Sequence, residues 1–208
     1  MKSLTVSDHA LVVTKLAILR AKTTAPDEFR RTLQDLTALL FAEASRSWET
    51  RAIEIETPLT RCRGAVLERA ITLVPILRAG LGMLDAIIRI VPEANVGHIG
   101  IYRDEETLRP VSYFTRLPVN LATSHTLLLD PMLATGNSAC EAASILKANG
   151  ATQIQFICIV SCPQGVERFQ SEHPDVAILT AAVDVELNAN GYIVPGLGDA
   201  GDRYFGTG

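Results

Sequence analysis

From residue 70 onward the chain alternates between short apolar runs and stretches with a helical period. The apolar runs indicate strands buried on both faces, and they cover residues 71–77, 96–102, 126–129, 154–160 and 176–179. The helical patterns cover residues 83–90, 138–149 and 164–171. Buried strands that alternate with helices predict an α/β fold, with a mostly parallel sheet and helices on both faces.

The amino-terminal part has a different pattern. Apolar residues recur with a helical period over residues 10–20 and again over 26–44, where Pro26 and two acids open the second helix. Residues 51–59 alternate polar and apolar side chains, which is typical of a half-exposed strand. We therefore expect N-terminal helices and an extended β-arm that could reach a partner subunit.

Composition narrows the class of protein. The 208 residues are 48% apolar and 20% charged, enough for one sizeable core, so we expect a single domain over residues 1–208. The formal net charge of −4, without a Lys and Arg cluster, argues against binding to nucleic acid or to a membrane surface. No apolar run is long enough to span a bilayer and the first residues do not resemble a signal peptide, which predicts a cytoplasmic protein.

The cysteines and histidines show no metal-ligand spacing, so no protein metal site is predicted. No C-x-x-C pair occurs, and we expect all four cysteines to be buried or half-buried free thiols; they are Cys62, Cys140, Cys158 and Cys162. The four histidines are interpreted as structural or surface residues; they are His9, His98, His125 and His173.

Residues 127–138 (LLLDPMLATGNS) carry the clearest chemistry. A buried strand ends in Asp130, a turn of small residues follows, and a helix begins near Ser138. Backbone N–H groups, two hydroxyls and the helix dipole make such a turn suited to a phosphate. The G-x-x-x-x-G-K-[ST] spacing of a P-loop is absent, and an acid beside the turn suits the hydroxyls of a sugar phosphate. The alternative is an ordinary Asp-Pro turn with helix-capping residues.

Two arginines end other predicted strands. Arg78 precedes Ala79 and Gly80, and Arg103 opens the charged stretch 103–110. Ligands of parallel sheets bind at the carboxyl ends of strands, so we expect both arginines to meet Asp130 in one crevice. Arginine at a glycine turn suits a diphosphate, and the polar stretch suits a lid; solvated surface loops are the alternative.

The last residues, 190–208, are dense in glycine yet contain tyrosine, isoleucine, valine and phenylalanine. Glycines let a ligand approach the backbone closely, so this pattern favours a pocket in which main-chain groups recognise a small flat ring. An irregular loop packed on the core is the alternative.

Three separated motifs, at 130–138, 74–82 and 191–203, together resemble the type I phosphoribosyltransferases, and their uracil branch in particular. This resemblance implies that 5-phosphoribosyl 1-diphosphate and uracil give UMP and diphosphate, with Mg²⁺ bound mainly through the ribosyl diphosphate. It also implies a C-terminal hood over the base, a homodimer or higher homo-oligomer, and GTP as an effector in parts of the family.

The resemblance also implies roles for individual residues. Arg78, Arg103 and Asp199 would be catalytic. The ribosyl diphosphate would be bound by those three residues and by Asp130, Pro131, Met132, Leu133, Ala134, Thr135, Gly136, Asn137 and Ser138. Uracil would be bound by Ile193, Gly198, Asp199 and Ala200.

The chain departs from the family pattern in a few places. Asn137 replaces a glycine, the early helix lacks a tyrosine before Glu43, and residues 206–208 lack the usual lysine. These differences bear on affinity and regulation more than on the reaction. Two rival hypotheses remain: a phosphoribosyltransferase for another base, such as a purine, and an RNA-binding regulator of pyrimidine metabolism that kept the fold.

Overall fold

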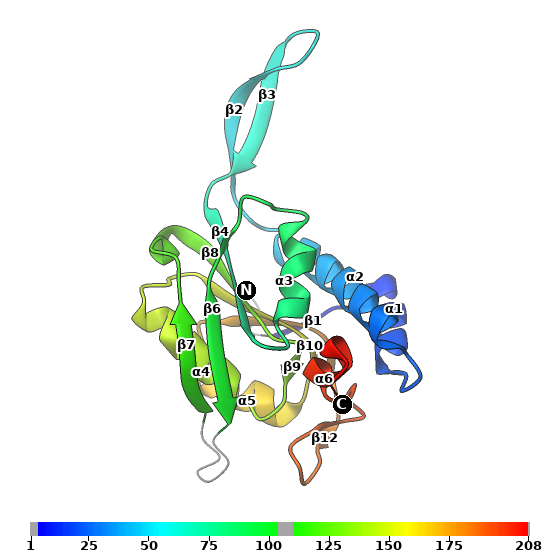
Figure 1. Ribbon diagram of the computed structural model, residues 1–208. Helices are drawn as coiled ribbons and strands as arrows, with labels where there is room; N and C mark the ends of the chain where they lie inside the picture. The colour runs from blue at the N-terminus through cyan, green and yellow to red at the C-terminus, as the bar shows by residue number, and fades with distance from the viewer. Residues whose placement is uncertain (1–3, 104–109, 208) are drawn as a thin grey trace.

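The computed structural model describes residues 4–103 and 110–207, and its centre is a nine-stranded sheet (Figure 1). The main strand order is β1 (Leu4–Val6), β11 (Ala177–Val183), β10 (Ile154–Ser161), β8 (Ser124–Leu129), β4 (Ala70–Leu77), β6 (His98–Arg103) and β7 (Pro110–Arg116). Short strands β5 (Asn95–Val96) and β9 (Met132–Leu133) pair with β4 and β10. Every pairing in this sheet is parallel except that of β6 with β7, so the predicted fold class is confirmed.

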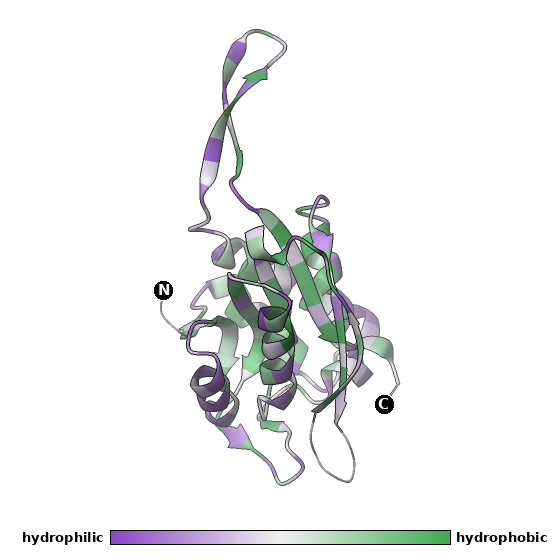
Figure 2. Ribbon diagram, turned by 90° about the vertical axis from the view of Figure 1, so that its left-hand side faces the viewer, coloured by the Kyte–Doolittle hydropathy of each residue, from purple (hydrophilic) through white to green (hydrophobic). Residues whose placement is uncertain are grey.

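Helices cover both faces because successive strand residues point to opposite sides. On β10, Ile157 belongs to the core under α1 (Ala10–Arg20), α2 (Pro26–Ala44), α3 (Leu81–Ile88) and α6 (Ala200–Phe205). The neighbouring Phe156 belongs to the core under α4 (Asn137–Ala148) and α5 (Pro163–Glu172). Figure 2 shows the hydrophobic strands between these two layers.

The order of the strands reverses between β4 and β8. The chain leaves β4 through α3 on one face and continues to β6, whereas it leaves β8 through α4 on the other face and continues to β10. The loops that follow β4 and β8 therefore separate, and a parallel α/β sheet binds its ligands in the crevice formed at such a point.

Two hairpins extend the domain. Strands β2 (Thr50–Glu56) and β3 (Arg61–Leu67) pair over their whole length and form an arm that stands away from the body, at the opposite end from α6 (Figure 1). Strands β12 (Glu186–Leu187) and β13 (Ile193–Val194) pair near α6. We call residues 186–205 the hood.

The predicted helices agree with α1 to α5 within about two residues at each end, but some elements were missed. The run 96–102 is divided at Gly97 into β5 and β6. The sequence did not reveal the short 3₁₀ helix Leu121–Thr123 or the elements β1, β3, β7, β9, β12, β13 and α6. The expectation that all cysteines are buried or half-buried is wrong for Cys62, which is exposed because it lies on the arm. Within residues 4–103 and 110–207, no helix combines the length and apolarity needed to cross a membrane.

Candidate active site

The two predicted arginines and Asp130 lie at the same edge of the sheet. Strand β4 ends at Leu77 immediately before Arg78, β6 ends at Arg103, and β8 ends at Leu129 immediately before Asp130. The strands are parallel, so their carboxyl ends lie at the same edge of the sheet, which is where parallel α/β sheets bind their ligands. The predicted lid falls on residues 104–109, which lie outside the described residues.

The turn between β9 and α4 has the geometry expected of an anion-binding loop. Gly136 has φ +82°, a left-handed conformation that glycine adopts without strain, and it immediately precedes the twelve-residue helix α4. The N–H of Asn137 donates to Thr135 Oγ1 at 3.4 Å. The first N–H groups of α4 and the positive end of its helix dipole lie together at this loop, an arrangement that suits an anion such as phosphate.

Two residues that the sequence did not single out, Cys162 and Gly165, pack against the backbone of this loop. The Cys162 thiol donates to the carbonyl oxygen of Ala134 at 3.1 Å. A Cβ on Gly165 would lie 2.6 Å from the carbonyl oxygen of Leu133 and would also overlap that of Ala134. A glycine inside a helix costs about 0.5–1 kcal/mol relative to alanine, so its presence in α5 was a signal that another backbone approaches closely.

Asp130 is a buried carboxyl group with a raised pKa. Burial raises its pKa to about 7, the N–H of Met132 opposes this rise by donating to Oδ1 at 3.3 Å, and the charge of Asp199 adds to it. The long-range influence of Asp199 shows that the hood brings a second carboxylate near the end of β8. Two acids this close together favour a ligand that supplies hydroxyl donors or a cation.

The loop after β4 packs closely against the end of β8. A Cβ on Gly80 would lie 2.8 Å from Ile76 N and would overlap the carbonyl oxygen of Leu129. Only glycine therefore lets this loop approach the strand that ends at Asp130. The guanidinium carbon of the exposed Arg78 lies 5.6 Å from the centre of the Phe205 ring, a cation–π contact that joins this loop to the hood.

The hood lies beside the loop that follows β4. Asp199 caps α6, since its Oδ1 accepts a hydrogen bond from Asp202 N at 2.9 Å. A Cβ on Gly201 would lie 3.9 Å from Ala79 Cβ, so the start of α6 contacts the loop after β4. The hood is therefore an ordered part of the site and not a loosely packed tail.

The predicted base-binding residues follow one another along the hood. Ile193 and Ala200 are buried, whereas Gly198 and Asp199 are exposed. Gly198 has φ +79°, where a side chain would be strained. The structure thus places Arg78, Asp130, the loop of residues 134–138 and the hood at the same edge of the sheet; which ligand each of them binds stays a prediction.

One group of side chains in the described part of the chain could hold a metal ion, and it lies away from the hood. Cys140, Glu172 and His173 have ligand atoms within 4.8 Å of one another. Burial raises the pKa of the Cys140 thiol to about 11, Glu172 accepts from Arg168 Nε at 3.0 Å, and His173 Nε2 lies 3.0 Å from the Cys140 carbonyl oxygen. These contacts describe hydrogen-bonded packing between α4 and α5.

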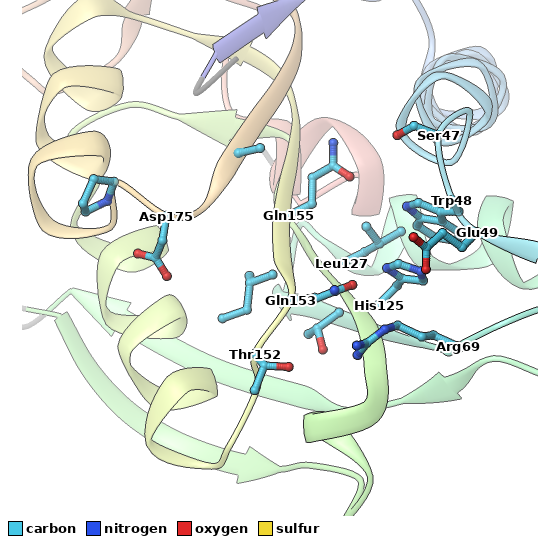
Figure 3. Close-up of a pocket in the computed structure, with 14 residues that line it drawn as sticks. Ser47, Trp48, Glu49, Arg69, His125, Leu127, Thr152, Gln153, Gln155 and Asp175 are labelled. Atoms are coloured by element: carbon cyan, nitrogen blue, oxygen red, sulfur yellow. The ribbon is translucent and has the colours of Figure 1, made fainter. Parts of the chain in front are cut away.

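A cavity of about 570 Å³ lies at the opposite, amino-terminal edge of the strands and contains none of the predicted site residues (Figure 3). The rings of Trp48 and His125 stack on its wall, 4.4 Å apart. Burial lowers the pKa of His125, with a further lowering from Arg69 opposed by Glu49. This cavity adjoins the base of the arm and is separate from the crevice described above.

The family model and the curated relatives that match this chain carry the same description. The family model described as uracil phosphoribosyltransferase matches residues 6–207. The uracil phosphoribosyltransferase of Dictyoglomus thermophilum is 53% identical over 203 residues, which cover 97% of this chain and 98% of that protein. That of Paracoccus denitrificans is 51% identical over 205 residues, which cover 98% and 97%.

Solved structures share the fold. The AQ2163 protein from Aquifex aeolicus superposes with a TM-score of 0.93 at 35% identity, and the match covers 98% of both chains. A hypoxanthine-guanine phosphoribosyltransferase from Bacillus anthracis superposes with a TM-score of 0.52 at 12% identity, covering 76% of this chain and 80% of that one. At 12% identity, the similarity to the Bacillus anthracis enzyme is evidence for the fold alone.

Proposed function

The chain belongs to the uracil phosphoribosyltransferase family, and from this premise we propose that it transfers the 5-phosphoribosyl group from 5-phosphoribosyl 1-diphosphate to uracil, giving UMP and diphosphate. The observation that carries the proposal is the meeting of three parts at one crevice: the loop of residues 134–138, the carboxylate of Asp130 and the hood. A phosphate site, a hydroxyl acceptor and a main-chain pocket are what a ribosyl transfer to a small base requires.

The ribosyl diphosphate would be held at three points. The N–H groups of residues 134–138 would receive the 5-phosphate, and the Asp130 carboxylate would accept from the ribose hydroxyls. Hydroxyl donors favour the ionised carboxylate, so substrate binding would lower the raised pKa of Asp130. Arg78 and Arg103 would hold the diphosphate, since guanidinium groups pair with phosphate oxygens in a bidentate manner.

Mg²⁺ fits this site through its preference for oxygen ligands, because Asp130 and Asp199 supply carboxylates close enough for the charge of Asp199 to add to the rise that burial causes in the pKa of Asp130. When bound with the diphosphate, Mg²⁺ neutralises charge on the leaving group. Arg78 and Arg103 would add to that stabilisation as the bond to C1 of the ribose breaks. The hood would shield the cationic sugar from water and orient N1 of uracil toward C1.

The proposed reaction is tested by incubating the protein with uracil, 5-phosphoribosyl 1-diphosphate and Mg²⁺ and by separating the products chromatographically. We expect UMP and diphosphate in equal amounts, and we expect chelation of Mg²⁺ to abolish their formation until the ion is restored. Binding of the ribosyl diphosphate without any UMP in the presence of uracil would contradict the proposal.

We also propose that the arm joins two copies of the chain. Strands β2 and β3 contact each other over their whole length, yet most of their side chains are exposed, and an isolated two-stranded hairpin is marginally stable in water. Leu59 at its tip is 95% exposed and Ile55 is 41% exposed. A projecting arm with exposed apolar side chains is stabilised when a second copy covers it, which supports a homodimer or larger homo-oligomer.

The double variant Ile55→Asp with Leu59→Asp should shift the protein from dimer to monomer, because two charges would be buried without partners at the interface. Light scattering coupled to size-exclusion chromatography measures the change. Val119→Asp, at a fully exposed position away from the arm, is the matched control and should leave the mass unchanged. A monomeric wild type, or an unchanged mass in the double variant, would overturn the role of the arm.

An RNA-binding role and activation by GTP can each be tested directly. An RNA-binding regulator would need a basic surface, which the net charge of −4 does not favour, and a filter-binding assay measures this activity. GTP activation stays a prediction of the family resemblance alone, and UMP formation with and without GTP tests it.

A further inference from the structure

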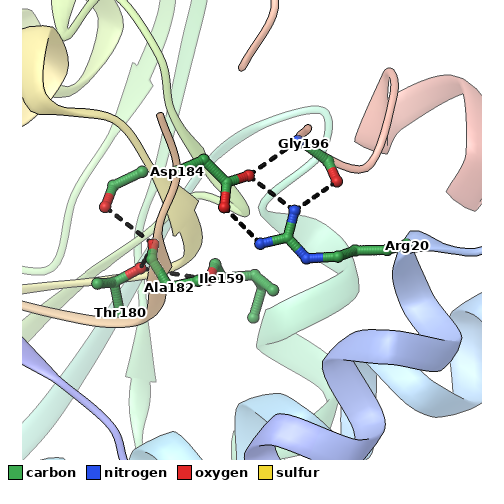
Figure 4. Close-up of polar contacts among 7 residues, drawn as sticks. Arg20, Ile159, Thr180, Ala182, Asp184 and Gly196 are labelled. Carbon is green, nitrogen blue, oxygen red and sulfur yellow. Dashed lines mark hydrogen bonds and ion pairs between the residues drawn. The ribbon is translucent and has the colours of Figure 1, made fainter. Parts of the chain in front are cut away.

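A half-buried ion pair fastens the hood to the rest of the domain (Figure 4). Arg20, the last residue of α1, donates from Nη2 to Asp184 Oδ1 at 2.5 Å and from Nη1 to Asp184 Oδ2 at 2.7 Å. Asp184 follows β11 and is only 7% exposed. A bidentate pair in this setting has a fixed geometry as well as strength.

The same ion pair is hydrogen-bonded to both the carbonyl oxygen and the N–H of Gly196, a residue of the hood. Arg20 Nη1 also donates to the carbonyl oxygen of Gly196 at 2.7 Å, and the N–H of Gly196 donates to Asp184 Oδ2 at 2.8 Å (Figure 4). Gly196 has φ +59°, and a Cβ there would lie 3.0 Å from the carbonyl carbon of Ile193 and overlap its oxygen. The ion pair therefore holds the Gly196 end of the turn from Ile193 to Gly196. The backbone of this turn is closely packed, so it has little room to move.

A second set of hydrogen bonds, donated by Arg203, also joins the hood to the rest of the protein and does not involve the ion pair. Arg203 donates to the carbonyl oxygens of Leu197 at 2.8 Å, Leu19 at 2.6 Å and Ala21 at 2.7 Å. Its guanidinium carbon lies 4.5 Å from the centre of the Phe29 ring. Loss of the Arg20 pair should therefore loosen the turn at Gly196 while α6 stays in place.

We propose that Arg20 and Asp184 are positioning residues for base recognition, acting through the Gly196 peptide on the main-chain groups of Ile193 and Gly198. This inference rests on the proposed function, in which those two residues bind uracil. Main-chain recognition provides no side chain that selects the base, so affinity for uracil depends on how well the turn is held before uracil binds. Except for Asp199, which caps α6, the residues assigned to the ribosyl diphosphate lie on other loops, so its binding should depend little on the pair.

Arg20→Lys and Asp184→Asn test this role. Lysine keeps the positive charge but cannot span both Asp184 oxygens and the Gly196 carbonyl, and asparagine keeps the shape but loses the charge and one acceptor. For both variants we expect KM for uracil to rise about 10- to 100-fold, KM for the ribosyl diphosphate to stay within about 2-fold, and kcat to fall less than the uracil KM rises. The matched control is Lys15→Gln. It breaks the exposed ion pair between Lys15, which is on the same helix as Arg20, and Asp35 on α2, and it should change neither KM.

Hydrogen exchange separates this inference from the proposed function, because it needs no activity. In both variants the Gly196 amide should exchange at least about 10-fold faster, while the Gly206 amide, which donates to Asp202, keeps its rate. Faster exchange at Gly196 with a selective rise in the uracil KM supports the proposal. Unchanged exchange, unchanged uracil KM, or an equal rise in both KM values would overturn it. A wild type that forms no UMP refutes the proposed function, whatever the exchange rates show.

Discussion

Asp130→Asn should lower kcat/KM for 5-phosphoribosyl 1-diphosphate by about 100-fold or more while the protein stays folded. A charged acceptor contributes about 1.5–3 kcal/mol to each hydrogen bond, and an amide presents a single oxygen to the ribose hydroxyls. Steady-state kinetics with UMP as the measured product test the change. Asp35→Asn, an exposed position on α2, is the control and should keep wild-type kinetics. Unchanged kcat/KM in Asp130→Asn would remove this residue from the site.

The same variant should be more stable than the wild type at alkaline pH. In the folded protein the pKa of Asp130 is raised to about 7, above about 3.9 for an unfolded aspartate. The folded state therefore holds more protons between these values, and the free energy of unfolding falls as pH rises from about 4 through about 7. Asparagine removes this dependence.

Thermal unfolding without substrate provides the measurement. We expect the Tm of Asp130→Asn to exceed the wild-type Tm by roughly 8–16 °C at pH 8, with the difference shrinking toward zero near pH 4. The pKa difference corresponds to about 4 kcal/mol, and each kcal/mol shifts Tm by roughly 2–4 °C in a protein of this size. A residue that lowers stability and yet is needed for turnover is typical of a functional site. A difference independent of pH would show that ionisation of Asp130 does not cause it.

Gly165→Ala should lower kcat/KM by about 100-fold through displacement of the phosphate loop. The new Cβ would lie 2.6 Å from the Leu133 carbonyl oxygen and would overlap that of Ala134, and these are backbone atoms that cannot rotate away. A displacement of about 1 Å in a positioning loop can cost about 100-fold in rate. Overpacking also costs about 1–3 kcal/mol, so Tm should fall by roughly 2–12 °C.

The neighbouring variant Gln164→Ala controls for helix propensity in α5, because Gln164 is exposed, and it should leave both rate and Tm unchanged. Inorganic phosphate binding, measured calorimetrically, identifies the cause, since a displaced loop should weaken it in Gly165→Ala alone. Wild-type phosphate affinity together with a lowered rate would contradict displacement of the loop as the cause.

The parts of the site that could be predicted from sequence are those encoded locally. A buried strand, an acid at its end and a glycine turn lie within residues 127–138, so one window of sequence contains both the geometry and the chemistry. The positions of Arg78 and Asp130 followed from the same rule, because residues at the carboxyl ends of parallel strands share one edge.

The supporting contacts could not be predicted because they join distant positions. Arg20 and Asp184 are 164 residues apart, and neither lies in a pattern that distinguishes it from a surface charge. The arm shows a different limit: β3 has no clear alternation of polar and apolar residues, and only its end, at Leu67, packs on the core of its own chain.

The most direct test of the account is the base that the hood accepts. With the ribosyl diphosphate and Mg²⁺ in excess, kcat/KM is measured for uracil and for hypoxanthine. Because a site built to hydrogen-bond one ring leaves its polar groups unpaired with another, we expect kcat/KM for uracil to be at least about 1,000-fold higher. Equal values, or a preference for hypoxanthine, would contradict the account.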